Sequence, residues 1–207
     1  MPKLQRLYLV RHGETAWSLS GRHTGRTDIP LTAKGEGDAR KLAERLNGAS
    51  FARVFTSPLQ RARRTSELTN LKSSVEIDPD LAEWDYGDYE GLQSSKIRET
   101  EPNWNIFRDG CPNGESPTEV TLRADSLITR LRSLEGDIAI FSHGHFGRVL
   151  ATRWIGLEIE NALRFLLDTA SLSILGYGHR LAAEPAIILW NAVADETSSS
   201  CSPQRIP

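Results

Sequence analysis

The chain has 207 residues, of which 39% are hydrophobic and 25% are charged, and its formal net charge is −2 at pH 7. This composition is that of an ordinary soluble globular domain, and it lacks the basic excess that nucleic-acid binding requires. Cys111 and Cys201 stand far apart without a CxxC spacing. That excludes a disulfide framework and a thiolate zinc site, and it predicts two free thiols.

The apolar stretches are only long enough for strands, so no membrane span is expected. The candidate catalytic residues Arg11 and His12 stand so near the N-terminus that the apolar core of a signal peptide does not fit before them. We therefore expect a cytoplasmic protein that binds neither a membrane nor nucleic acid.

The first element is an apolar, β-prone run at residues 7–10 that ends at Arg11-His12-Gly13. It predicts a buried strand with polar groups at its C-terminal end. Thr32 can cap the helix that follows, and Gly48 is its stop signal. One face of that helix is apolar and consists of Ala39, Leu42, Ala43 and Leu46.

Shorter elements are expected between residues 54 and 92. Val54 and Phe55 indicate a second strand, Ser57-Pro58 begins a helix that carries Arg61, and residues 75–77 form a third strand. Residues 79–92 are rich in acids, aromatics and glycine without a clean period, which predicts a loop. We expect residues 79–115 to form part of a lid over a pocket.

A long helix is predicted after Ser116, where Pro117 and Glu119 complete a capping-box pattern. Its apolar side is expected to consist of Leu122, Leu127, Ile128, Leu131 and Leu134. Residues 137–142 then carry the best strand signal in the chain.

This strand ends at His143-Gly144-His145 before another helical pattern, which repeats the layout of the first motif. Residues 172–177 and 187–190 are predicted to be late strands. The polar, serine-rich segment 194–207 is predicted to be a tail outside the core.

Alternating strands and helices predict an α/β fold, a three-layer α/β/α sandwich with a mostly parallel central sheet, in one domain over residues 1–193. Such sheets bind ligands beyond the C-terminal ends of their strands. Arg11, His12, Arg61 and His143 all follow predicted strands, so folding can bring them together.

These side chains suit a phosphate dianion. An imidazole is largely neutral at pH 7 and can attack phosphorus, while arginine presents a fork of donors that matches phosphate oxygens. The leaving oxygen needs a proton, for which Glu83 is the best candidate, because Leu81 and Trp84 flank it and an apolar flank favours a protonated carboxyl. Its rivals in the same loop are Asp85, Asp88 and Glu90, unless the whole loop is solvated acid.

At these positions the sequence resembles the histidine phosphatase superfamily, whose mark is an RHG triplet after the first strand. Here the triplet is Arg11-His12-Gly13. The resemblance continues through RHTGRTDIPLT, SPLQRARRT, AEWDYGDYEG and SHGHF and spans about residues 6–191. The SHGHF and EWDYG motifs most resemble those of small acid phosphatases and of sedoheptulose-bisphosphatase-like members.

The resemblance implies that His12 is phosphorylated, that Arg11, Arg61 and His143 bind the phosphate, and that Glu83 donates the proton. Further substrate contacts are expected from Ser18, Thr24, Gly25, Tyr86 and Gly144. Tyr86 is as readily explained as packing in the lid, and Gly144 as a turn residue. No metal and no organic cofactor is expected.

The expected partner is a small phosphorylated substrate, hydrolysed through a phosphohistidine, with the oligomeric state left open. One alternative is a phosphoglycerate mutase, but such enzymes carry ERHYG where this chain has Trp84 and Asp85 in place of the two basic groups. A second is a catalytically silent module that binds a phosphorylated ligand. A third reading makes His143 and His145 a metal pair, although no third ligand stands at a diagnostic spacing.

Overall fold

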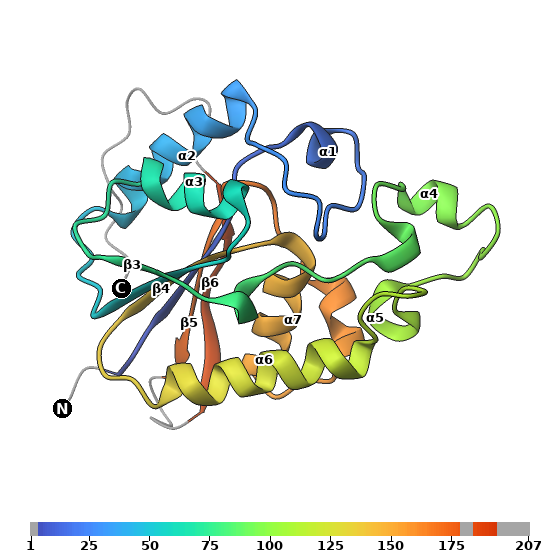
Figure 1. The fold of residues 1–207 in the computed structure, drawn as a ribbon. Helices are drawn as coiled ribbons and strands as arrows, with labels where there is room; N and C mark the ends of the chain where they lie inside the picture. Colours follow the sequence, from blue (N-terminus) through green and yellow to red (C-terminus); the bar gives the residue numbers. More distant parts are fainter. Residues whose placement is uncertain (1–3, 179–183, 194–207) are drawn as a thin grey trace.

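In the computed structural model, which describes residues 4–178 and 184–193, six strands form one sheet with helices on both faces (Figure 1). The predicted tail at 194–207 and Cys201 lie outside the described residues. The strands are β1 (Leu7–Arg11), β2 (Arg53–Thr56), β3 (Val75–Ile77), β4 (Ile138–Ser142), β5 (Leu172–Tyr177) and β6 (Pro185–Ala192).

The sheet has the order β3-β2-β4-β1-β5-β6. The first four strands pair in parallel, and β5 and β6 continue the sheet antiparallel. The α/β/α layers are confirmed, with a parallel centre and an antiparallel edge. The chain leaves β1 towards β2 and leaves β4 towards β5, so the two strands form a topological switch point, where α/β sheets bind ligands.

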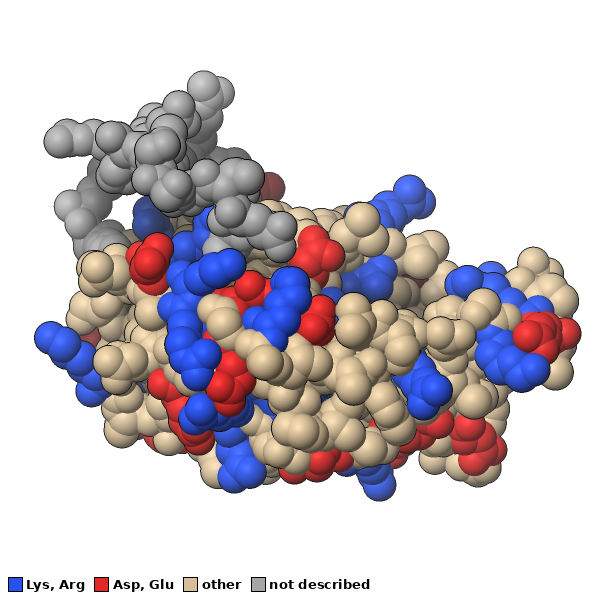
Figure 2. All heavy atoms as spheres, turned by 90° about the horizontal axis from the view of Figure 1, so that it is seen from above, with Lys and Arg blue, Asp and Glu red and all other residues tan. Residues whose placement is uncertain are grey.

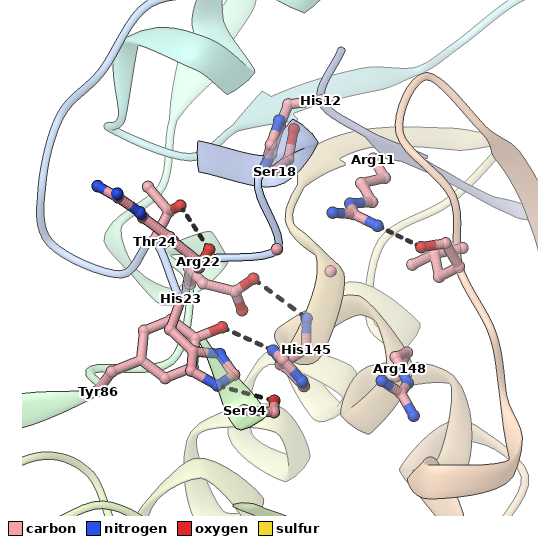
Figure 3. Close-up of a pocket in the computed structure, with 14 residues that line it drawn as sticks. Arg11, His12, Ser18, Arg22, His23, Thr24, Tyr86, Ser94, His145 and Arg148 are labelled. Atoms are coloured by element: carbon pink, nitrogen blue, oxygen red, sulfur yellow. Dashed lines mark hydrogen bonds between the residues drawn. The ribbon is translucent and has the colours of Figure 1, made fainter. Parts of the chain in front are cut away.

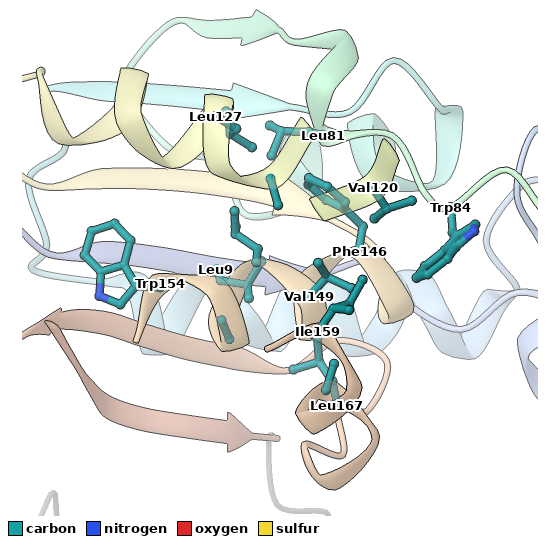
Figure 4. Packing of buried hydrophobic residues seen from close by; sticks show 14 of the residues in the cluster. Leu9, Leu81, Trp84, Val120, Leu127, Phe146, Val149, Trp154, Ile159 and Leu167 are labelled. Atoms are coloured by element: carbon teal, nitrogen blue, oxygen red, sulfur yellow. The ribbon is translucent and has the colours of Figure 1, made fainter. Parts of the chain in front are cut away.

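The strands are apolar throughout because both faces of the sheet are covered. Leu7 and Leu9 face one hydrophobic cluster, and Tyr8 and Val10 face the other. The larger cluster packs between the sheet and the lower helices, where Leu9, Phe146 and Val149 meet in Figure 4.

Two helices, α2 (Ala33–Leu46) and α3 (Gln60–Leu68), cover the upper face in Figure 1. Thr32 caps α2 as predicted, since its Oγ1 accepts a hydrogen bond from the Gly35 N–H at 2.9 Å. Gly48 follows the end of α2 with a φ of +83°, a conformation that favours glycine.

The lower face is covered by α6 (Pro117–Arg132), α7 (Gly144–Trp154) and the 3₁₀ helix η3 (Ile159–Arg164). The capping box at the start of α6 is present. Leu122 was expected on the apolar side of α6, which is wrong, because its side chain is 63% exposed. Val120 and Ala124 face the core instead; two residues turn a helix by about 200°, which points Leu122 to solvent.

The segment 79–115 contains short helices, two of them within residues 79–92, so the prediction of a plain loop at 79–92 is corrected. They are η1 (Pro79–Leu81), η2 (Gly87–Tyr89), α4 (Ser94–Ile97) and α5 (Ile106–Asp109), and a further short helix, α1 (Ala16–Leu19), follows β1. Each is too short to show a periodicity. Trp84 is fully buried in the larger cluster, and its Nε1 donates to the Glu115 carbonyl at 2.8 Å.

Acidic and basic side chains alternate on the face seen in Figure 2, without a continuous basic field. On α2, for example, Glu36 pairs with both Arg40 and Arg64. Within the described ranges, no helix combines the length and the apolarity that crossing a bilayer needs.

Candidate active site

A cavity of about 220 Å³ lies beyond the C-terminal ends of β1 and β4 (Figure 3). Its walls come from widely separated segments, because the parallel strands end at one edge of the sheet and the segment 79–115 folds back over that edge. The lining residues are Arg11, His12, Ser18, Gly21, Arg22, His23, Thr24, Glu83, Tyr86, Ser94, Gly144, His145, Arg148 and Leu167.

His12 follows β1 and is buried at the cavity wall. Its Nδ1 lies 2.7 Å from the Gly13 carbonyl oxygen, which can only accept, so Nδ1 carries the proton. Burial lowers the pKa of His12 well below its usual value, and the charges of Arg61 and Arg11 lower it further. The imidazole is therefore neutral, and its Nε2 keeps a lone pair.

Arg11 precedes His12 and lines the same cavity. Its Nη1 donates to the Leu167 carbonyl, while its Nε is buried without a hydrogen-bond partner among the described residues. A buried unpaired donor is costly, and an anionic oxygen would satisfy it. Gly144 leaves room for this side chain, since a Cβ there would lie 3.2 Å from the Arg11 Cζ.

Arg61 and His143 lie directly behind the cavity wall and are not among its lining residues. The Arg61 side chain is fully buried, and its Nε donates to His143 Nδ1 at 3.2 Å. Its other nitrogens donate to the carbonyls of Thr24, Gly25 and Thr27.

Because arginine only donates, the proton of neutral His143 is on Nε2, which lies 2.7 Å from Ser57 Oγ. The rings of His12 and His143 lie with their centroids 5.1 Å apart. The structure thus brings Arg11, His12, Arg61 and His143 together, with the last two facing protein groups.

Glu83 reaches the cavity from the segment 79–115, and its side chain is nearly buried. Leu81 and Trp84 are buried beside it, as the sequence predicts. The carboxylate itself faces main-chain amides: Oε1 accepts from Trp84 N and Phe146 N at 2.9 and 2.8 Å, and Oε2 accepts from His145 N at 3.1 Å. Oε2 has the greater remaining capacity to accept a hydrogen bond or bind a proton.

The three rival acids lie outside the cavity lining. Asp85 pairs with Arg26 at 2.7 Å, and Asp88 accepts from the Asn113 side chain at 2.9 Å. Glu90 accepts hydrogen bonds from the Gly25 N–H at 2.9 and 3.0 Å. Among the four acids weighed for this loop, Glu83 is the one that lines the cavity.

The remaining predicted substrate contacts divide into two groups. Ser18, Thr24, Tyr86 and Gly144 line the cavity. Gly25 does not line it: its carbonyl accepts from Arg61 and its N–H donates to Glu90, which makes it part of the support behind the wall.

The cavity also contains residues that the sequence did not single out as contacts, notably Arg22, His23, Ser94, His145 and Arg148. Trp84 and Asp85 replace two basic groups of the mutases, but Arg22 and Arg148 join Arg11 in the cavity wall, so the wall is not poor in cations. The sequence did contain a signal for Arg148. It follows Gly144 by four residues on the predicted helix, and residues four apart lie on the same helix face.

His23, Tyr86 and His145 form a cluster of rings at one end of the cavity (Figure 3). The Tyr86 hydroxyl and His145 Nδ1 are 2.6 Å apart. Burial raises the pKa of Tyr86 and lowers that of His145, so the hydroxyl keeps its proton and donates it to the imidazole. His143 and His145 thus engage different partners, and no group of three His, Cys, Asp or Glu side chains within residues 4–178 and 184–193 could hold a metal ion.

The buried imidazoles predict a loss of stability in mild acid. Burial lowers the pKa of His12, His143 and His145 well below 6.5, and that of His23 to about 4, so below pH 6.5 the unfolded chain binds more protons than the folded one. Stability is full above pH 6.5 and falls as the pH drops towards the folded-state values. Each imidazole contributes up to about 1.4 kcal/mol per pH unit.

We expect urea unfolding at a series of pH values from 8 to 5 to show this decline, with proton uptake on unfolding at pH 5.5. A free energy of unfolding that stayed constant between pH 7 and 5 would contradict it. His23→Gln removes one titrating group and should make the slope shallower.

Comparisons with known proteins agree with this site. A family model described as the histidine phosphatase superfamily (branch 1) matches residues 7–192. An acid phosphatase from Mycobacterium tuberculosis is 44% identical over 178 residues, covering 84% of this chain and 87% of that protein. A sedoheptulose 1,7-bisphosphatase from Saccharomyces cerevisiae is 37% identical over 254 residues, covering 91% and 94%.

A further relative and a solved structure are also similar to this chain. A probable phosphoglycerate mutase from Escherichia fergusonii is 35% identical over 181 residues, covering 83% of this chain and 84% of the relative. The solved structure of an open reading frame from Mycobacterium tuberculosis superposes with a TM-score of 0.86 at 39% identity, covering 92% and 99% of the two chains.

Proposed function

The chain belongs to the histidine phosphatase superfamily, and we propose that it hydrolyses small-molecule phosphate monoesters through a phosphohistidine on His12. One observation carries the proposal. The neutral His12 imidazole, with its Nε2 lone pair, lines the same cavity as the unpaired donor of Arg11 and the carboxylate of Glu83. Nucleophile, anion ligand and acid thereby line one cavity.

In the first step, Nε2 of His12 attacks the phosphorus and the ester P–O bond breaks. Protonated Glu83 gives its proton to the departing oxygen, so the product leaves as a neutral alcohol. Arg11, and Arg61 and His143 from behind, stabilise the charge on the three remaining phosphate oxygens.

In the second step, the Glu83 carboxylate takes a proton from water while the water oxygen attacks the phosphorus. The P–N bond breaks, inorganic phosphate leaves, and His12 is again neutral. Glu83 is protonated again, so the cycle closes without any other reactant.

We propose a sugar phosphate or sugar bisphosphate as the substrate type. Support comes from two relatives, which are named an acid phosphatase and a sedoheptulose 1,7-bisphosphatase. The hydroxyl groups of Ser18, Thr24 and Ser94 line the cavity and offer hydrogen bonds to a polyol. Turnover of a generic aryl phosphate separates this proposal from a silent binding module, which would release no phosphate.

We expect hydrolysis to exceed mutase activity. In this chain Asp85, at a position where mutases carry a basic residue, pairs with Arg26 away from the cavity. Water activated by Glu83 should capture the phosphohistidine before a bound acid can reorient and take the phosphoryl group back.

Incubation with 3-phosphoglycerate and trace 2,3-bisphosphoglycerate tests this expectation. Free phosphate should appear in step with substrate loss, with little 2-phosphoglycerate. Isomer forming much faster than phosphate would make the protein a mutase and leave the phosphohistidine chemistry intact.

A further inference from the structure

The main chain directly after His12 is held from two sides. On one side, Gly13 packs against α2 so closely that a Cβ added at Gly13 would lie 2.4 Å from the Gly35 carbonyl oxygen. On the other side, the Gly13 N–H donates to Thr65 Oγ1 on α3 at 3.0 Å. Glycine has no Cβ to restrict its torsion angles, so these outside contacts fix the conformation at Gly13.

The hydroxyl of Thr65 has a second partner in the main chain of α3. Thr65 Oγ1 donates to the carbonyl of Arg61, four residues earlier, at 2.7 Å. This bond uses the single hydroxyl proton, because a carbonyl oxygen only accepts, and it leaves a lone pair for the Gly13 N–H. A threonine often bonds the carbonyl four residues earlier in a helix. The bond to Gly13 is of another kind, since it joins residues 52 positions apart.

The peptide group between His12 and Gly13 is thereby held at both of its polar groups. Its carbonyl accepts from the Ala170 N–H at 3.0 Å, and its N–H donates to Thr65. The next carbonyl along the chain, that of Gly13, lies 2.7 Å from His12 Nδ1. The position of this acceptor therefore depends on the hydrogen bond to Thr65, whose side chain is fully buried and does not line the cavity.

This acceptor decides which nitrogen of His12 can attack phosphorus. A neutral imidazole carries one proton, on Nδ1 or on Nε2, and the hydrogen bond made by one nitrogen selects the tautomer. With the Gly13 carbonyl beside Nδ1, the lone pair is on Nε2. If the carbonyl turned away, the proton could move to Nε2, and the lone pair that attacks would be lost.

We propose that Thr65 is a positioning residue whose hydroxyl, acting through Gly13, keeps the proton of His12 on Nδ1 and its lone pair on Nε2. The inference rests on the proposed function, because it concerns the nucleophile of that reaction. The rival explanation is structural, in which the Thr65 hydroxyl only stabilises α3 against the loop after β1. Such a role would lower the free energy of unfolding without altering the tautomer of His12.

Thr65→Val tests the proposal with little change in side-chain volume. A methyl group in place of Oγ1 would lie 3.0 Å from the Gly13 nitrogen, whereas non-bonded atoms need about 3.5 Å, so Gly13 has to move and its N–H loses the acceptor. Thr65→Ser keeps the hydroxyl. Thr152→Val is the matched control, because Thr152 is also fully buried and donates to the carbonyl four residues earlier, at 2.8 Å. Within the described ranges its hydroxyl accepts no main-chain N–H.

Nitrogen-15 NMR of the histidine side chains is the first measurement, because it distinguishes a protonated ring nitrogen from an unprotonated one. The His12 signals are assigned by their absence from His12→Ala. We expect the proton on Nδ1 in the parent, Thr65→Ser and Thr152→Val, and an additional Nε2-protonated fraction in Thr65→Val. If Thr65→Val does not fold, Thr65→Ala, which also removes the acceptor, takes its place. A tautomer that is unchanged in the variant without the hydroxyl would overturn the proposal.

The first turnover of an aryl phosphate, followed by burst kinetics, is the second measurement. Its maximal rate should fall about tenfold or more in Thr65→Val, because fewer His12 side chains present an aligned Nε2 lone pair. The substrate concentration at half-maximal rate should change much less, since Arg11 keeps its contacts. Thr65→Ser and Thr152→Val should resemble the parent.

The two measurements fail independently. If the parent releases no phosphate from any ester, the proposed function fails, while the NMR comparison still judges the role of Thr65. A tautomer that shifts in Thr65→Val without any loss of rate would exclude His12 as the nucleophile and leave the positioning by Thr65 standing.

Discussion

His12→Ala should lose about 10⁴-fold or more in kcat/KM, with the fold retained. The loss is this large because the neighbouring imidazole of His143 cannot replace His12 as the nucleophile: its Nδ1 accepts from Arg61, and its Nε2 carries the proton. The main structural consequence is that the Gly13 carbonyl loses the donor at 2.7 Å, which costs about 1–3 kcal/mol.

Rapid-quench experiments with ³²P-labelled substrate provide the measurement. The parent should carry an acid-labile phosphoryl group on His12, and the variant should carry none. Circular dichroism and thermal melting establish that the variant is folded. A label on another residue, or turnover in the variant within tenfold of the parent, would exclude His12 as the nucleophile.

Glu83→Gln should reduce turnover of a sugar phosphate by about 100-fold or more and that of an aryl phosphate much less. The difference arises because an alkoxide needs a proton in order to leave, whereas an activated aryl oxide hardly does. With aryl phosphates, dephosphorylation can still be slow, since Glu83 also activates water. The first turnover is therefore followed separately by burst kinetics.

Gln at position 83 would also turn an amide N–H₂ towards one of the main-chain N–H donors that Glu83 now accepts, which perturbs the segment 79–115. Glu90→Gln is the matched control, since Glu90 likewise accepts main-chain N–H groups but lies outside the cavity lining. Glu90→Gln should change turnover of the sugar phosphate and of the aryl phosphate by the same factor. If Glu83→Gln also reduced turnover of the sugar phosphate and of the aryl phosphate by the same factor, Glu83 would not be the proton donor.

Local sequence determined most of the long helices and strands and the positions where they begin and end. The strand at 7–10 and the helix capped by Thr32 follow from apolar spacing and capping, which act over a few neighbouring residues. The same holds for the strand that ends at Ser142. Because these strands are parallel, the sequence also indicated that Arg11, His12 and His143 meet at one edge of the sheet.

Only the tertiary structure decided which partner each of these side chains takes. Arg61 donates to carbonyls about 35 residues away, and Glu83 accepts from amides about 60 residues away. Arg148 became a residue of the cavity wall because the segment after α7 folds back and holds it by two carbonyls. Such contacts depend on strand order and helix packing, which bring distant segments together, whereas periodicity and capping report only on residues within a turn or two of one another.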